Sequence, residues 1–371
     1  MSLLASIYGK IADARNRLYD RGTLRSFDLG ARTISIGNIT TGGTGKTPLV
    51  AYVASILAER GGKVCILTRG YGRENPRDRV LVSDGDQIVA DVREAGDEPF
   101  ELARKLLGKA MVIADADRVG AARWAREEFG VTDFVLDDGF QHRRAKRDVD
   151  IVCIDATNPS GDGQAGSLRS GRMLPSGRLR EPVRNLTRVD IIVITRSDLV
   201  DDISDLRSEI SDLSPNSRVF LAENTIRRIV EIGEFNSIAE APQDRNGSFN
   251  AKTQRPQSEE PIIKNAEGIS TEIDGSRVYA FCGLGNPNGF FDQIRRNGVD
   301  VTGVKAFADH YNYTLQDMAE LQRSAVDSGA ECLVTTAKDA VKLSDLKFEI
   351  PCYVVEIDVE LDDPEQFAAM L

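Results

Sequence analysis

The chain has 371 residues, of which 41% are hydrophobic and 28% charged, so it is long enough for two domains with a sizeable core. Its net charge of −11 excludes nucleic acid as a general partner, because no overall positive field exists to attract a polyanion. Five cysteines without metal-ligand spacing indicate free, buried thiols in a reducing compartment.

Residues 1–32 predict a basic amphipathic helix with six Lys or Arg against three Asp. Its apolar face consists of Leu4, Ile7, Tyr8, Ile11 and Leu18. Such a helix lies in an anionic membrane surface or packs on the protein's own core, and the residues alone leave both alternatives open. Lys10 and Asp13 interrupt the apolar part, so we predict no signal peptide. Because no run is long enough to span a membrane, we expect a cytoplasmic protein.

The stretch ITTGGTGKTP, residues 39–48, predicts a phosphate-binding loop between a strand at 33–37 and a helix at 47–60. In such a loop the backbone N–H groups cradle phosphate, the Lys neutralises it, and the Thr hydroxyl reaches Mg²⁺. The strict pattern has Gly where Thr40 stands, and a Gly-rich turn without a ligand is the alternative. The predicted nucleotide contacts are Thr40, Thr41, Gly42, Gly43, Thr44, Gly45, Lys46 and Thr47, and Thr47 is also a predicted Mg²⁺ ligand.

Apolar strands alternate with helices over residues 33–233. We predict strands at 33–37, 63–68, 111–115, 133–138, 150–156 and 190–196, and helices at 47–60, 97–107, 117–129 and 201–213. This alternation indicates a parallel sheet covered by helices on both faces, so we predict a P-loop NTPase-like α/β domain. Ligands of such sheets bind at the carboxyl ends of the strands.

Residues 234–276 are rich in Ser, Asn, Gln, Pro and charge, which predicts a mobile insertion or linker. A second alternation follows it. Its predicted elements are strands at 277–283, 331–336 and 352–358 and a helix at 288–297. We therefore predict a second, smaller α/β domain over residues 277–371.

Two pairs of carboxylates stand at ends of predicted elements. Asp137 and Asp138 end a strand, where P-loop proteins hold Mg²⁺ opposite the loop Thr. Capping of the next turn is the alternative for this pair. One or two carboxylates suffice, because Mg²⁺ keeps several waters and takes phosphate oxygens. Asp97 and Glu98 begin a helix, where capping and compensation of the helix dipole are the simplest interpretation.

Arginines gather at the same end of the predicted sheet. Arg69 and Tyr71 follow the strand at 63–68, and residues 168–188 contain six arginines with Glu181 as the one acid. An Arg/Gly/Pro-rich loop in an acidic protein is typical of an anion site, and a solvated surface is the alternative. The stretch TRSD, 195–198, faintly resembles the base-reading element of GTPases, with Arg in place of Lys.

Taken in order, these stretches resemble the tetraacyldisaccharide 4′-kinase family, the lipid A 4′-kinases of Gram-negative bacteria. The matching stretches are GNITTGGTGKTP, LTRGYGR, AGDEP, DDGFQH, GRMLPSGRLREP, FCGLGNPNGFF, FADHYNYT and TTAKDAVKL, from Gly37 to Leu343. The resemblance implies transfer of the γ-phosphoryl of Mg²⁺-bound ATP to the 4′-hydroxyl of a tetraacylated glucosamine disaccharide 1-phosphate. It also implies peripheral attachment to the cytoplasmic face of the inner membrane, which favours the membrane-surface alternative for residues 1–32.

The resemblance also implies roles for individual residues. Asp97 corresponds to the base that accepts the hydroxyl proton, and we expect His310, in a polar–aromatic loop, to pair with it. Glu98 joins Thr47, Asp137 and Asp138 as a predicted Mg²⁺ ligand. The predicted substrate-binding residues are Arg69, Tyr71, Gln141, His142, Arg172, Arg180 and Glu181. Among them, the arginines of 169–188 are expected to bind the acceptor's 1-phosphate.

Two features depart from the family pattern. Residues 234–276 form a longer segment than usual, and TRSD stands where the family differs, which leaves the choice between ATP and GTP open. The alternative function is a P-loop switch protein, such as a metal-insertion or assembly factor; a non-catalytic membrane-binding module is a third possibility. The arginine-rich loop and a second domain with Asp309 and His310 favour a kinase. We predict a lipid-linked disaccharide and an anionic inner-membrane surface as partners, with no nucleic acid and no obligate protein partner.

Overall fold

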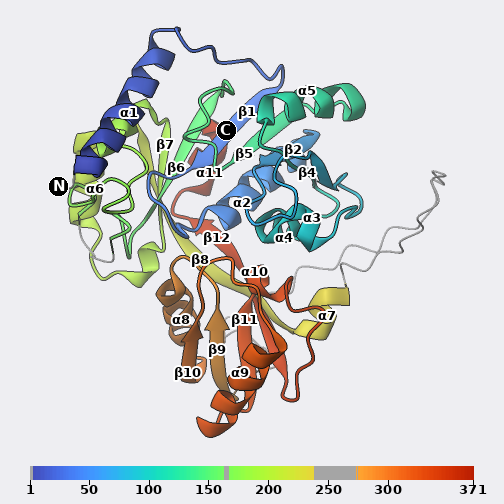
Figure 1. Ribbon diagram of the computed structural model, residues 1–371. Coiled ribbons are helices and arrows are strands. Elements are labelled where there is room, and N and C mark those ends of the chain that lie inside the picture. The colour runs from blue at the N-terminus through green and yellow to red at the C-terminus, as the bar shows by residue number, and fades with distance from the viewer. Residues whose placement is uncertain (1–2, 163–166, 238–272, 274) are drawn as a thin grey trace.

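A computed structural model describes residues 3–162, 167–237, 273 and 275–371 (Figure 1). The described strands form one twelve-stranded sheet in the order β10-β9-β11-β12-β8-β7-β6-β1-β5-β2-β4-β3. Neighbouring strands run parallel except for the pairs β3–β4 and β8–β12. The predicted α/β class, with a mostly parallel sheet and a smaller α/β part, is confirmed.

The six predicted strands of the larger part are present. They are β1 (Arg32–Gly37), β2 (Val64–Thr68), β4 (Ala110–Ala114), β5 (Asp133–Asp137), β6 (Val149–Asp155) and β7 (Ile191–Thr195). Their residues are almost all buried, because α2 (Lys46–Glu59), α3 (Val92–Ala95) and α4 (Asp97–Lys105) cover one face, and α5 (Arg118–Phe129) and α6 (Ser204–Leu213) cover the other. Short 3₁₀ turns, η1 (Val183–Arg188) and η2 (Ser197–Leu199), flank β7.

The sequence analysis missed two strands of this part. The edge strand β3 (Val80–Ser83) has four residues, and β8 (Arg218–Glu231) has fourteen residues whose burial alternates along much of its length. This alternation arises because β8 carries charged side chains between its apolar ones, so it lacks the continuous apolar run of the parallel strands. The strand β8 matters because its second half leaves the larger part and pairs with the smaller one.

The smaller part extends the same sheet through β12 (Cys352–Leu361), β11 (Cys332–Thr336), β9 (Arg277–Cys282) and β10 (Asp300–Ala306). Helices α7 (Ile232–Ser237), α9 (Leu315–Asp327) and α10 (Ala337–Ala340) pack on one face, and α8 (Pro287–Arg296) packs on the other. Figure 1 shows this part below the larger one, joined to it by the long β8 and β12. We call the two parts the large unit (3–162, 167–222 and 359–371) and the small unit (223–237, 273 and 275–358).

Two features depart from the predicted division. Residues 359–371 were expected in the smaller domain, but Val359 and α11 (Pro364–Met370) complete the core of the large unit, with Phe367 edge-on to Phe220 at 5.2 Å. The predicted mobile segment began at residue 234, but α7 continues to Ser237, because Phe235 is buried in the small unit's core. Residues 238–272 and 274 of that segment lie outside the described residues.

Helix α1 (Leu3–Asp20) lies on the outside of the large unit, and its Gly9 faces Met173, with whose side chain an added Cβ would make ordinary van der Waals contact at 3.5 Å. The prediction for the cysteines is confirmed: all five are free and buried. Across the described ranges, we find no helix that combines the length and the apolarity needed to cross a bilayer.

Candidate active site

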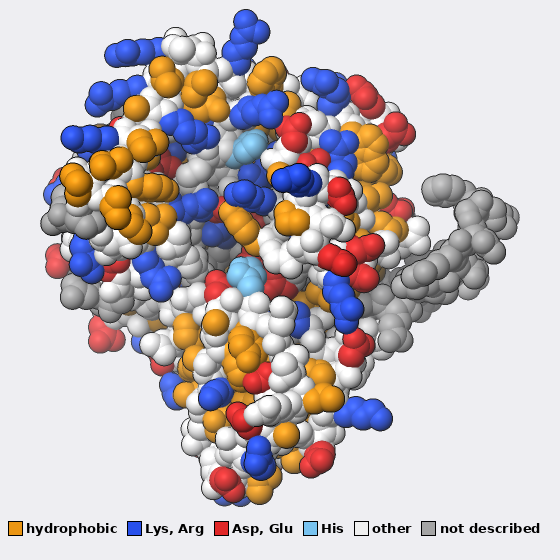
Figure 2. All heavy atoms as spheres, in the orientation of Figure 1, with side chains coloured by type: hydrophobic (Ala, Val, Ile, Leu, Met, Phe, Trp, Pro, Cys, Tyr) orange, Lys and Arg blue, Asp and Glu red, His pale blue; other side chains and the backbone are white. Residues whose placement is uncertain are grey.

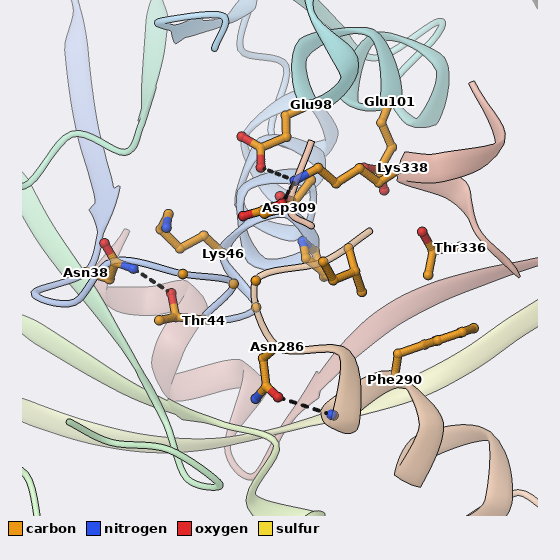
Figure 3. A pocket seen from close by; sticks show the side chains of 18 of the residues that line it. Asn38, Thr44, Lys46, Glu98, Glu101, Asn286, Phe290, Asp309, Thr336 and Lys338 are labelled. Carbon is orange, nitrogen blue, oxygen red and sulfur yellow. Dashed lines mark hydrogen bonds and ion pairs between the residues drawn. The ribbon is translucent and has the colours of Figure 1, made fainter. Parts of the chain in front are cut away.

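A cavity of about 420 Å³ lies between the two units, at the carboxyl ends of the parallel strands (Figure 3). The predicted phosphate loop lines one side, and all eight of its predicted contacts, residues 40–47, reach the cavity. The small unit lines the other side with residues of α8, α10 and β12. A Cβ on Gly285 would come 2.5 Å from the backbone N of Gly43, so only glycine permits this close approach of the two units.

The phosphate loop ends in a left-handed glycine. Gly45 has φ 72°, and α2 begins at the next residue, Lys46. The helix N-terminus therefore presents unpaired backbone N–H groups and the positive end of its dipole to the cavity. Lys46 Nζ lies 3.8 Å from Asp138 Oδ1, with both side chains largely enclosed.

Asp137 and Asp138 end β5 opposite the phosphate loop, in two electrostatic settings. Burial and the charges of Glu98 and Asp138 raise the pKa of Asp137 to about 6. For Asp138, burial acts in the same direction, but Lys46 and Arg180 outweigh it and hold its pKa well below the usual range. Burial and the neighbouring carboxylates thus dominate at Asp137, and the charge of Lys46 offsets them only in part.

This arrangement fits Mg²⁺. A divalent cation beside Asp137 would offset the burial and the repulsion that together raise its pKa. Among the residues that the structure describes, no three His, Cys, Asp or Glu side chains form a complete metal cage. Such a cage is unnecessary, because Mg²⁺ is held by one or two carboxylates, water and phosphate oxygens.

Asp97 of the large unit and His310 of the small unit are in direct contact, and His310 also lines the cavity. His310 Nδ1 lies 3.0 Å from both carboxylate oxygens of Asp97, and Lys342 Nζ lies 3.4 Å from one of them. Burial opposes ionisation, yet the hydrogen bond from His310 and the charge of Lys338 lower the pKa of Asp97 to about 2. An ionised Asp97 can only accept, so Nδ1 donates to it, and in the neutral ring Nε2 carries the free lone pair.

The simplest interpretation of Asp97 was helix capping. In the structure the N-cap of α4 is Gly96, and Asp97 is the first helical residue. Its carboxylate does accept from the adjacent Glu98 N at 3.0 Å, but its remaining partners are His310 and Lys342 of the small unit. The capping interpretation of Asp97 is therefore wrong.

Backbone strain gathers at this cavity. Three described non-glycine residues have positive φ, namely Asp138 (50°), Arg196 (56°) and His310 (58°), and all three line the cavity. Such conformations persist where the surroundings impose them, and they cluster at functional sites.

Comparison with known proteins identifies the family. A family model described as tetraacyldisaccharide-1-P 4′-kinase matches residues 1–371. The chain belongs to this family.

Relatives and a solved structure agree with this assignment. A tetraacyldisaccharide 4′-kinase of Halothermothrix orenii is 35% identical over 100% of this chain and 91% of its own length. That of Geobacter sulfurreducens is 34% identical over 100% and 92%. The crystal structure of LpxK from Aquifex aeolicus, described as in complex with ATP, superimposes with a TM-score of 0.68 at 27% identity, covering 99% of this chain and 96% of that one. The chain is an ATP-dependent kinase of the tetraacyldisaccharide 4′-kinase family.

The kinase cavity contains residues that the sequence analysis did not single out. Lys338 Nζ lies 2.9 Å from Glu98 and 2.9 Å from Asp309, so it joins α4 to the small unit (Figure 3). Arg196 donates to the backbone O of Gly43 and pairs with Asp155, so it supports the phosphate loop. Both residues stood in quoted stretches, TTAKD and TRSD, but nothing local indicated their partners.

The predicted substrate residues of the kinase separate into two groups. Arg69, Tyr71 and Arg180 line the cavity, and Arg69 Nη1 donates to the Tyr71 hydroxyl at 3.1 Å. The residues outside the cavity lining are Gln141, His142, Arg172 and Glu181.

The second group is engaged by the protein itself. Glu181 is 2% exposed and pairs with Arg188, and Arg172 is a surface side chain 3.7 Å from Asp162. Burial and nearby arginines lower the pKa of His142 to about 4, so this imidazole is neutral near pH 7. Because Glu181 is buried and paired with Arg188, the structure does not indicate direct contact between Glu181 and a ligand.

Proposed function

We propose that the protein transfers the γ-phosphoryl group of ATP to the 4′-hydroxyl of a tetraacyldisaccharide 1-phosphate, the acceptor in the name of its family. The observation that carries this proposal is that His310, held by the buried Asp97, lines the same cavity as the phosphate loop. A nucleotide switch has no need of a base on the far wall, whereas transfer to a hydroxyl has.

On the nucleotide side, Lys46 and the N–H groups at the start of α2 bind the phosphates. Asp137, Asp138 and the Thr47 hydroxyl would hold Mg²⁺, which supplies charge neutralisation on the phosphate oxygens when bound. Glu98 lines the same cavity and stands within the electrostatic reach of Asp137, so we retain it as a further ligand candidate.

On the acceptor side, His310 Nε2 takes the proton of the 4′-hydroxyl as its oxygen attacks the γ-phosphorus; the bond from phosphorus to the β–γ bridging oxygen breaks and ADP leaves. Asp97 fixes the tautomer and orientation of the ring through Nδ1 and stabilises the imidazolium that forms. The transition state is loose, so positioning and charge stabilisation carry most of the rate.

A direct assay tests this function. Purified protein is incubated with Mg²⁺-ATP or Mg²⁺-GTP and tetraacyldisaccharide 1-phosphate, and phosphorylated lipid is measured. We expect lipid phosphorylation with ATP. Nucleotide hydrolysis without a phosphorylated lipid would favour the switch protein instead.

We further propose that α1 binds the surface of the inner membrane at its cytoplasmic face. Leu4 and Ile11 are 64% and 62% exposed, and Ala5, Gly9 and Asn16 form the buried side of the helix. Figure 2 shows hydrophobic side chains gathered over α1 with Lys and Arg beside them. This exposure favours a membrane contact over the alternative, in which the apolar face packs on the protein's own core.

The double variant Leu4→Ser/Ile11→Ser should bind anionic vesicles at least tenfold more weakly, since each large apolar side chain contributes about 1.5 kcal/mol or more when buried. Vesicle co-sedimentation measures this change. The matched control is Leu315→Ser, which removes a leucine that is 72% exposed on the small unit and should leave binding unchanged. Equal binding by the double variant and the wild type would refute the membrane role of α1.

Arg180 is proposed to act on the nucleotide side rather than on the acceptor's 1-phosphate. Its Nη1 lies 2.7 Å from Asp138 Oδ1 and 3.2 Å from Asn38 Oδ1. We expect Arg180→Ala to raise the KM for Mg²⁺-ATP roughly tenfold, the effect of losing a hydrogen bond to a charged group, and to change the KM for lipid less. Steady-state kinetics with each substrate varied in turn measure both constants.

Arg169→Ala is the control for that experiment, because Arg169 pairs with Glu209 of α6 and does not line the cavity. A larger rise in the KM for lipid than in the KM for ATP would return Arg180 to the acceptor site.

A further inference from the structure

The buried side of α1 contains one polar residue, Asn16, which is 8% exposed. Its Nδ2 donates to Glu181 Oε2 at 2.9 Å, and its backbone O accepts from Arg143 at 2.9 Å. Asparagine is a poor helix former, so its place on the packed side of a helix indicates a specific partner.

From Glu181, buried hydrogen bonds continue to the phosphate loop. Gln141 Nε2 donates to Glu181 Oε1 at 2.9 Å and to the backbone O of Asn38 at 2.8 Å. Asn38 is 1% exposed, and its Nδ2 donates to Thr44 Oγ1 at 3.0 Å. An unbroken series of contacts therefore joins α1 to the loop that binds phosphate.

The backbone beside Glu181 makes a second connection. Arg180 N donates to Ile39 O at 2.7 Å, and Thr41 N donates to Arg178 O at 2.8 Å. Residues 178–181 thus contact the phosphate loop along one edge and α1 through Glu181. The side chain of Arg180 extends from this segment to Asp138.

The Glu181 carboxylate has little freedom within this network. It also accepts from Arg188 at 2.9 and 3.0 Å and from Asn185 at 3.0 Å. A buried carboxylate with partners on both oxygens is held in one orientation, so a change at one partner is passed to the others. Asn16 is the partner that belongs to α1.

We infer that Asn16 is a positioning residue. Through its hydrogen bond to Glu181, the packed helix α1 fixes the position of residues 178–181 and of Asn38 relative to the phosphate loop. The inference rests on the proposed nucleotide roles of the loop and of Arg180. It gives α1 a function on its inner side in addition to the proposed membrane contact on its outer side. The helix then couples the membrane-facing surface to the geometry of the phosphate site.

The test uses the full chain with lipid substrate dispersed in detergent, so that vesicle binding does not enter the rate. Asn16→Leu keeps a similar volume and removes the donor. We expect the KM for Mg²⁺-ATP to rise severalfold, less than in Arg180→Ala because Asn16 acts only through Glu181, while the KM for lipid and vesicle co-sedimentation stay at wild-type values. A general loss of structure would change all three.

The matched control is Asp13→Asn. Asp13 pairs with Arg184, so the variant also removes a contact between α1 and the body, but one outside the network. Its kinetics should equal those of the wild type. If Asn16→Leu lowers the melting temperature so far that kinetics cannot be measured, Asn16→Ser, which is too short to reach Glu181, is assayed in its place with the same expectation.

A double-mutant cycle adds a second measurement. Asn16→Leu combined with Glu181→Gln should raise the KM for Mg²⁺-ATP scarcely more than Glu181→Gln alone, because both act through one link. Wild-type kinetics for Asn16→Leu, or additive effects in the cycle, would overturn the inference. An inactive wild type in the same assay would instead overturn the proposed function.

Discussion

Replacing Asp97 with asparagine should lower kcat by roughly 10²- to 10⁴-fold, the usual contribution of general acid–base catalysis. Asparagine keeps the shape and the acceptor for the adjacent Glu98 N, so the melting temperature should change little. The variant lacks the negative charge that lies 3.0 Å from His310 Nδ1 and keeps the proton on that nitrogen. Steady-state kinetics and a thermal melt on the same preparation measure the two quantities.

His310→Ala should cause a similar loss, and the double variant should be scarcely worse than either single variant, because the two residues act as one unit. Fully multiplicative losses would show that they act independently. Wild-type turnover by Asp97→Asn would contradict a catalytic role for the Asp97 carboxylate and would show that its role is structural.

The pH profile distinguishes which member of the pair accepts the proton. The hydrogen bond that His310 donates to Asp97 raises the pKa of His310 above its usual value of about 6.5, although burial and Lys338 oppose the shift. A base must be unprotonated, so kcat/KM should rise with pH through that raised pKa. In Asp97→Asn the carboxylate no longer raises the pKa of His310, so the acidic limb of the kcat/KM profile should move to lower pH. If Asp97 itself were the base, its pKa of about 2 would leave no limb between pH 5 and 8.

Lys46→Ala should lower kcat roughly 10²- to 10³-fold, as for loss of one preorganised group that stabilises developing charge. The fold should survive, because Asp138 keeps its contact with Arg180 at 2.7 Å. Lys109→Ala is the control: its ammonium pairs with Glu59 at the surface, and its loss should not change turnover. Undiminished turnover by Lys46→Ala would remove the phosphate loop from the mechanism.

Much of the fold followed from local pattern. The fully buried parallel strands are continuous apolar runs, and such runs are conspicuous in a sequence. The apolar-run pattern did not predict strands that are buried on one face only or that are largely exposed. Strand β8 alternates, and the edge strand β10 is largely exposed, so neither forms an apolar run.

The part of the site that consists of local sequence motifs was predictable from the sequence. The phosphate loop and the strand-end pair Asp137–Asp138 are local signals. The partners Asp97 and His310 are 213 positions apart, and Lys338 is 240 positions from Glu98. Spacing carries no information about such contacts, so the first pair came from the family resemblance and Lys338 was missed.

The return of residues 359–371 to the large unit affects how the chain folds during synthesis. Phe367 packs on Phe220 and Tyr52, and Leu371 is 1% exposed in the same core. Tyr52 and Phe220, which Phe367 covers, are synthesised 315 and 147 residues before it. Domains generally fold as units during synthesis, those nearer the N-terminus first. We therefore expect the nascent large unit to keep an uncovered apolar surface beside α2 until residues 359–371 are synthesised, a surface that chaperones for exposed apolar side chains would recognise.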